Sequence, residues 1–292
     1  MNFINFGFFL IPSALIGVVC NWTVVFSVLK ISSLKQSFGY LTANQALGDA
    51  IHCTAFLFYV CPMMILDIEL FRIYSNHCGF VLIFCYELSV LSHLIISFNR
   101  LTAVYMPTKY SSMFSLRNSI IIIVILWITT AMFTIYFYQY LCPLFWVKEL
   151  GLFMFRSSDF CAILSWYTDF CKFIVCISLV VIFDIVTVAK VHSINKLTCF
   201  QGAAFVFELV SYFVVPLFLA DNKIALFFLT TFAWVSVHSI DGIITVLCNP
   251  DLRKFITFRR EKSNQVSSTN NAHQHRGEQR SEIPHILSTP ST

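Results

Sequence analysis

The sequence predicts an all-α membrane protein: a bundle of seven transmembrane helices followed by a short amphipathic eighth helix. Of the 292 residues, 58% are hydrophobic and only 12% are charged, whereas soluble domains average about 25% charged residues. The apolar residues also occur in blocks of about 20, which is the length of a helix that crosses a bilayer. A soluble enzyme could not cover its surface with so few charges. The net charge of +4 gives no indication of nucleic-acid binding.

Seven apolar stretches are separated by short polar breaks. They are Phe3–Leu29, Phe38–Leu66, Cys78–Tyr105, Asn118–Tyr140, Trp166–Ala189, Leu197–Leu219 and Ile224–Cys248. Only residues 220–223 separate the last two stretches, so six spans is the alternative count. The first stretch has no basic leader and is too long for the apolar part of a signal peptide, so we expect it to be a membrane span.

Basic residues are concentrated on one side of the predicted bundle. The loops after the first, third and fifth spans carry lysine and arginine but no acidic residue, whereas the other loops mix both signs. Because basic loops stay in the cytoplasm, we expect a plasma-membrane protein with its N-terminus outside and its C-terminus in the cytoplasm. Residues 1–260 then form the transmembrane domain. Residues 261–292 are polar and lack Phe, Tyr and Trp, so they are expected to be a disordered cytoplasmic tail.

The segment after the seventh span has the pattern of a surface helix. Pro250 suits the first turn of a new helix. Apolar side chains from Leu252 to Phe258 alternate with basic ones, among them Arg253. Such a helix lies on the anionic inner surface of the lipid bilayer.

Acidic side chains lie inside the predicted spans, where a charge costs about 2.5–3.5 kcal/mol at mid-bilayer depth. We expect them to face the bundle interior; they are Asp49, Glu87, Glu208 and Asp241. Asn21 and Ser89 lie at a depth comparable with that of Asp49 and Asp241, so these four residues are expected to form an intramembrane polar network. The network could bind water, a proton or a sodium ion near Asp49. It could equally serve only to hydrogen-bond adjacent helices together.

The remaining titratable and cysteine residues give weaker signals. His93 stands alone in the third span and is expected to be a buried hydrogen-bonding residue. The sequence contains no His/Asp/Glu metal set and no Ser/His pair at suitable spacing and depth, so it predicts neither a metal site nor an enzyme.

Three cysteines fall at the expected outer side, where oxidising conditions permit a disulfide. Cys78 begins the third span, and Cys142 and Cys161 lie in the second outer loop. We expect the pair Cys78–Cys161, because Cys161 lies just before the fifth span. Cys142 is the competing partner.

Several segments resemble, in order, the motifs of the rhodopsin-like G-protein-coupled receptors. Residues 17–24 read GVVCNWTV, similar to Gly-Asn-x-x-Val, and residues 44–49 read NQALGD, similar to Asn-Leu-Ala-x-x-Asp. Residues 99–110 read NRLTAVYMPTKY, similar to Asp-Arg-Tyr with its later Pro-x-x-Tyr. Trp127 stands at the position of the tryptophan of the fourth helix, and residues 241–250, DGIITVLCNP, resemble the Asn-Pro-x-x-Tyr region.

A closer resemblance is to the nematode serpentine chemoreceptors of class X. It rests on KQSFG at 35–39, QALGDAIH at 45–52, FYVCP at 58–62 and CYELSVLSH at 85–93. The resemblance implies a chemosensory receptor, in the membrane of a sensory cilium, that binds an external small-molecule ligand and activates a heterotrimeric G protein. The alternative function is a transporter or ligand-gated ion channel that uses the intramembrane acids as an ion path.

The resemblance also implies roles for particular residues. Those expected at the G-protein-coupling face are Asn99, Arg100, Pro107, Asn249, Pro250 and Arg253. Asn99 replaces the acid that pairs with the arginine in the wider receptor class, and Lys196 is basic where an acidic partner is expected. Both departures weaken the expectation of the usual activation switches.

The expected ligand contacts are on the outer half of the third helix. Leu82, Tyr86 and Glu87 fall on one side of that helix. Leu82 stands where amine receptors carry an aspartate, which argues against a biogenic amine and favours a small, largely apolar ligand.

Overall fold

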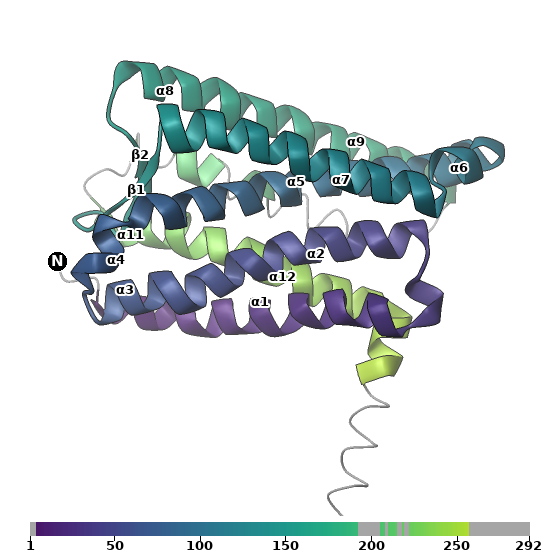
Figure 1. Cartoon of the computed structure of the whole chain (residues 1–292), viewed down its shortest axis with the longest axis horizontal. Coiled ribbons are helices and arrows are strands. Elements are labelled where there is room, and N and C mark those ends of the chain that lie inside the picture. Colours follow the sequence, from purple (N-terminus) through teal and green to yellow (C-terminus); the bar gives the residue numbers. More distant parts are fainter. Residues whose placement is uncertain (1–3, 192–204, 208–209, 215–217, 219–221, 257–292) are drawn as a thin grey trace, which may run out of the picture. The chain divides into compact units, whose positions relative to one another are not determined.

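The computed structural model describes residues 4–191, 205–207, 210–214, 218 and 222–256. Among these residues, six helical spans are long and apolar enough to cross a membrane (Figure 1). They are Asn5–Lys30, Ser37–Ile65, Ser75–Tyr105, Leu116–Leu141, Asp159–Lys190 and Lys223–Cys248. A shorter apolar helix, Phe205–Val214, falls within the predicted sixth span, much of which lies outside the described residues. The chain is therefore an all-α, multi-pass membrane bundle, as predicted.

The chain divides into two compact units, Met1–Asn249 and Pro250–Thr292. The first unit holds the bundle. In the second unit, residues 250–256 are helical, which agrees with the predicted start of an eighth helix at Pro250. The predicted tail at 261–292 lies outside the described residues.

Two of the spans are single α-helices, α1 (Ile4–Lys30) and α5 (Ser75–Tyr105), and the other four include a π-helical turn. These four are α2 (Ser37–Ala55), η2 (Phe56–Val60) and α3 (Cys61–Ile65); α7 (Leu116–Thr134) and η3 (Ile135–Leu141); α8 (Asp159–Ser165), η4 (Trp166–Cys171) and α9 (Lys172–Val191); and α11 (Lys223–Phe227), η5 (Phe228–Phe232) and α12 (Ala233–Cys248). A π turn holds more residues than an α turn, so it changes which face of the span points inward.

Short elements connect the spans. They are η1 (Ser32–Leu34), α4 (Glu69–Ile73), α6 (Pro107–Met113) and the strands β1 (Leu144–Val147) and β2 (Leu152–Phe155). Figure 1 shows the two strands and α4 at the end of the bundle where α1 begins, with α6 at the opposite end. We refer to these as the hairpin end and the α6 end.

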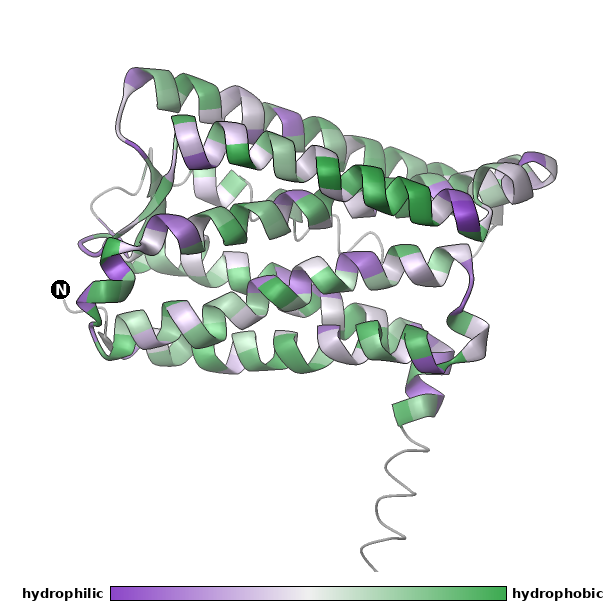
Figure 2. Cartoon of the chain, viewed as in Figure 1, coloured by the Kyte–Doolittle hydropathy of each residue, from purple (hydrophilic) through white to green (hydrophobic). Residues whose placement is uncertain are grey.

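Burial separates an inner group of spans from an outer group. The spans that contain α2, α5 and α12 are more than half buried in their most apolar windows, whereas those that contain α1, α7 and α9 are less than a third buried in theirs. Figure 2 shows hydrophobic residues along the helices and hydrophilic residues mainly at the two ends. The exposed apolar faces suit contact with lipid, and the in-span acids Asp49, Glu87 and Asp241 all lie on the inner group.

The strands form an antiparallel hairpin that the sequence analysis treated only as an outer loop. Leu144 pairs with Phe155 and Val147 with Leu152, and the turn ends at Gly151, whose φ of 70° favours glycine. The hairpin is bonded to three different helical segments: Trp146 N donates to Ser75 Oγ (3.1 Å), Tyr212 OH donates to Phe153 O (3.0 Å) and Thr231 Oγ1 donates to Gly151 O (2.9 Å). These bonds hold it against the end of the bundle.

A surface ion pair also links the hairpin turn to the loop before α4. Lys148 Nζ lies 2.8 Å from Asp67 Oδ2, and Arg72 pairs with the other carboxylate oxygen. The hydrogen bond from Lys148 and the charge of Arg72 hold the pKa of Asp67 below its ordinary value. This link therefore contributes stability at neutral pH and loses it as the pH falls through the lowered pKa. All three side chains are accessible to solvent, so the contribution is small.

The expected disulfide partner of Cys161 was wrong. Cys161 is bonded to Cys142, with a Cα–Cα distance of 5.5 Å, and Cys78 is a buried free thiol on α5. The hairpin gives the reason: antiparallel pairing of β1 with β2 brings the two ends of the loop together, and each end carries one of these cysteines. Position along the chain favoured Cys78, but the strand pairing decides the partner.

Replacing Cys142 with serine should lower the free energy of unfolding by about 3 kcal/mol, because the bond closes a loop of 19 residues. Thermal unfolding of the purified protein measures the loss, and thiol alkylation under denaturing, non-reducing conditions reports the released thiol of Cys161. Cys78→Ser is the matched control and should leave the disulfide intact. Loss of the disulfide in the Cys78 variant would contradict this assignment.

Candidate functional site

Two acid–imidazole pairs lie at the centre of the bundle, and we refer to Asp49, His93, His238 and Asp241 as the Asp–His cluster. His238 Nδ1 lies 2.6 Å from Asp49 Oδ1, and His93 Nε2 lies 2.9 Å from Asp241 Oδ2. Gln45 also bonds to Asp241, and its amide nitrogen lies 2.9 Å from His93 Nε2. These contacts join α2, α5 and α12.

Two of the four residues expected to form a polar network, Asp49 and Asp241, belong to the Asp–His cluster. Asn21 joins it from α1, since its Nδ2 donates to His238 O (3.0 Å). A Cβ on Gly242 would lie 2.5 Å from Asn21 Oδ1, so glycine at this position permits α1 and α12 to approach. Ser89 is fully buried, and its hydroxyl has no hydrogen-bond partner among the described residues, so it is not bonded to the cluster. His93, expected to stand alone, bonds to Asp241 instead.

The cluster must hold protons. Asp49 and Asp241 are both buried beside imidazoles of this cluster, and two neighbouring carboxylates in a low-dielectric interior cannot both remain charged without compensation. Imidazoles beside both acids can supply that compensation. The ring of His52 lies against that of His238, with centroids 3.9 Å apart and the planes tilted by 40°, so a third imidazole adjoins the cluster.

A sodium ion near Asp49 stays a prediction. Sodium prefers a shell of oxygen ligands, as other hard cations do, but Asp49 Oδ1 and Asp241 Oδ2 are already bonded to imidazole nitrogens. Among the described residues, no group of three or more His, Cys, Asp or Glu side chains has a metal-binding arrangement. Asp49 Oδ2 and Ser89 Oγ are buried and have no hydrogen-bond partner among the described residues, so these two oxygens remain as candidate ligands for the ion.

Asp49→Leu should destabilise the protein by about 1–3 kcal/mol, because it leaves the buried His238 Nδ1 without its hydrogen-bond partner. Asp49→Asn retains an oxygen at that position and should cost less. Thermal unfolding in detergent compares the two variants, with Met132→Leu on the exposed face of α7 as the control. If neither variant is less stable than the wild type, the pair contributes nothing.

A second ion pair lies towards the α6 end of the bundle. Arg100 Nη1 is 3.5 Å from Asp184 Oδ1, and Ser97 Oγ donates to Asp184 Oδ2 (3.2 Å). Asp184 is on α9, so the acidic partner that the sequence lacks at Asn99 comes from the neighbouring span. Arg100 also lies over the ring of Phe38, 5.6 Å from its centroid.

The other residues expected at the coupling face are placed as follows. Asn99 is buried on α5, Pro107 opens α6 and Asn249 ends α12. Pro250 and Arg253 lie in the helical residues 250–256 of the second unit. Their role in coupling stays a prediction. Lys196 and Glu208 lie outside the described residues.

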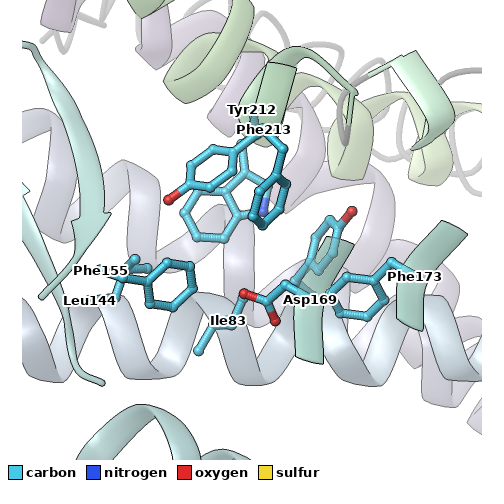
Figure 3. Close-up of a pocket in the computed structure, with 9 residues that line it drawn as sticks. Ile83, Leu144, Phe155, Asp169, Phe173, Tyr212 and Phe213 are labelled. Atoms are coloured by element: carbon cyan, nitrogen blue, oxygen red, sulfur yellow. The ribbon is translucent and has the colours of Figure 1, made fainter. Parts of the chain in front are cut away.

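An aromatic cavity lies deep in the bundle near the hairpin (Figure 3). Its volume is about 30 Å³. It is lined by Ile83, Tyr86, Leu144, Phe155, Asp169, Phe173, Tyr212, Phe213 and Trp234. A larger cleft of about 830 Å³, the hairpin cleft, shares Phe155, Tyr212 and Phe213 with it and extends to Arg156 and Asp159. A volume of this size can accommodate a small organic ligand.

Of the three expected ligand contacts, only Tyr86 lines this aromatic cavity. Leu82 is completely buried in the core, and Glu87 forms an ion pair with Lys172 on α9. Asp169, which lies on η4 and lines the cavity, was not among the residues expected at the ligand site. A polar residue in an apolar span was the available signal for it.

The two buried acids near the aromatic cavity, Asp169 and Glu87, each bond to a side chain of a neighbouring helix. Tyr138 OH donates to Asp169 Oδ1. The Lys172 ammonium, besides pairing with Glu87, lies 4.3 Å from the ring centroid of Phe133 and 4.4 Å from that of Phe173. Buried charge is therefore held here by rings as well as by hydrogen bonds.

Comparison with known proteins gives consistent matches. Residues 11–198 and 196–249 match the family described as serpentine type 7TM GPCR chemoreceptor Srx. The chain is 28% identical over 282 residues to serpentine receptor class X 45 of Caenorhabditis elegans, an alignment that covers 84% of this chain and 78% of the relative. It is 28% identical over 136 residues to the alpha-1A adrenergic receptor of Oryzias latipes, which covers 46% of this chain and 28% of that receptor.

Proposed function

The chain belongs to the Srx family of serpentine seven-transmembrane chemoreceptors, and on that premise we propose that it is a G-protein-coupled chemosensory receptor. The observation that carries the proposal is the family match, which extends from residue 11 to residue 249. In this proposal an external small molecule binds at the hairpin end and a heterotrimeric G protein binds at the α6 end. In this proposal the protein is located in the plasma membrane, and in a sensory cell it is located in the membrane of the cilium.

The geometry supports this division of roles. The aromatic cavity and the hairpin cleft offer a concave, largely apolar site near the hairpin. Arg100 and Asp184 lie nearer to α6 and join α5 to α9. An ion pair between two helices can be formed in one arrangement of the helices and broken in another. A ligand changes signalling only if it binds one arrangement better than the other.

The proposed orientation places the hairpin end outside the cell. The disulfide between Cys142 and Cys161 supports it, since such bonds persist in oxidising compartments. The basic loops after the odd-numbered spans support it independently.

Epitope tags test the orientation directly. A tag before residue 1 should be stained on intact cells, and a tag after residue 292 should be stained only after permeabilisation. Staining of the C-terminal tag on intact cells would contradict the proposal.

Substitutions of the ion pair near α6 should separate coupling from folding. Arg100→Ala should abolish ligand-dependent signalling while surface expression is retained, because Arg100 would contact the G protein. Asp184→Asn weakens a partly exposed pair worth about 1 kcal/mol, so ligand-independent signalling should rise about fivefold. A cyclic-nucleotide or calcium assay, normalised to surface expression, measures both effects.

Ile185→Val is the matched control for Asp184, since Ile185 is the next residue of α9 and is 55% exposed. It should signal as the wild type does. Unchanged signalling in both Arg100→Ala and Asp184→Asn would remove the pair from the coupling mechanism.

The alternative, a transporter or channel, makes a different prediction. The described acids belong to separate groups: Glu87 pairs with Lys172, and Asp49 and Asp241 belong to the Asp–His cluster. Uptake or current in proteoliposomes that contain only this protein would favour the alternative over the receptor.

A further inference from the structure

We propose that the ligand of this receptor carries a primary ammonium group, which enters the aromatic cavity and pairs with Asp169. The inference rests on the proposed receptor function and adds the chemical class of the ligand. It departs from the sequence-based argument from Leu82, because Asp169 supplies a carboxylate from a different helix.

Asp169 is placed where a bound group can reach it. Its side chain is on the π turn η4, is 2% exposed and lines the aromatic cavity. Figure 3 shows its carboxylate directed into the space between the labelled rings. Tyr138 donates to Oδ1, and among the described residues no donor bonds to Oδ2.

The charge at Asp169 is the one that the surrounding residues leave least compensated. The buried acids of the described residues are Asp49, Glu87, Asp169, Asp184 and Asp241. Each of the others is bonded to a lysine, an arginine or an imidazole, whereas Asp169 is hydrogen-bonded only to a hydroxyl group. Lys172 is nearby, but its ammonium is paired with Glu87. Two carboxylates and one ammonium leave a formal charge of −1.

The walls of the cavity suit a cation. Six of the nine lining residues are aromatic: Tyr86, Phe155, Phe173, Tyr212, Phe213 and Trp234. Aromatic faces attract ammonium groups, and the attraction increases when water is excluded. The protein provides its own example, because the Lys172 ammonium lies over Phe133 and Phe173, and Phe173 also lines the cavity.

The two volumes set the size of each part of the ligand. The aromatic cavity, at about 30 Å³, is above the roughly 10–15 Å³ that a single water needs, so it has room for a compact group such as a primary ammonium. The adjoining hairpin cleft, at about 830 Å³, has room for an apolar body. The ligand is therefore a primary amine with an alkyl or aryl body.

Matched probes that differ only in the head group test this inference. Purified full-length protein is exposed at pH 7.4 to phenethylamine, 2-phenylethanol and 3-phenylpropionate, and to hexylamine and hexanol. Ligand-induced stabilisation against thermal unfolding is the readout, which requires no G protein. The amines should stabilise the wild type, and the matched alcohols and the acid should bind at least tenfold more weakly.

Asp169→Asn keeps the shape of the side chain and an acceptor for Tyr138 but removes the charge. It should lower amine affinity at least tenfold and leave the weak binding of alcohols unchanged. Glu69→Gln, at an exposed acid on α4 that lines neither the aromatic cavity nor the hairpin cleft, is the control for a general effect of charge and should bind amines as the wild type does. If Asp169→Asn does not fold, Asp169→Glu retains the charge and should retain the preference for amines over alcohols.

Three results would overturn the inference: no amine of the series binds to the wild type, alcohols bind as tightly as amines, or Asp169→Asn binds amines normally. Each of these leaves the proposed receptor function standing, since a neutral ligand would also activate it. Conversely, amine binding without any G-protein signalling in cells would count against the receptor function while supporting the site.

Discussion

The apolar surroundings of the spans leave a buried charge without water, and this constraint governs how the bundle is held together. Four acids meet it through a basic or imidazole group on a different helix: Asp49 with His238, Asp241 with His93, Glu87 with Lys172, and Asp184 with Arg100. Removing one partner of such a pair leaves the other uncompensated. The pairs therefore compensate the charge of each acid and also fix the relative positions of α2, α5, α9 and α12.

The fold class and most of the spans follow from the sequence, because the length and composition of an apolar segment suffice to predict a crossing. The predicted ends of the described spans differ from the observed ones by a few residues, except where α8 begins earlier, at Asp159. Of the four in-span acids that were expected to be buried, Asp49, Glu87 and Asp241 are buried, and Glu208 lies outside the described residues. The partners of the buried acids were not predicted, because the pairing of Asp49 with His238 depends on how α2 and α12 are rotated.

The candidate ligand site was harder to predict for a related reason. Tyr86 was found from its position on the third helix, but Asp169 reaches the cavity from η4, where the helical period changes. A regular period of 3.6 residues does not reveal such a turn. Similarly, the partner of Cys161 depended on a β-hairpin whose two short strands lie within an expected loop. Both misses come from local departures from a simple helical bundle.

The π turn at Trp166–Cys171 also constrains the length of its span. An α-helix rotates by about 100° per residue, so deleting one residue from this turn would rotate α8 by that angle relative to α9. Cys161 on α8 would then point away from Cys142, to which it is bonded. A side-chain replacement in this segment changes the contacts of one residue. Deletion of one residue would instead change the orientation of every side chain on α8. The number of residues in this span, more than its composition, must therefore be preserved in homologous chains.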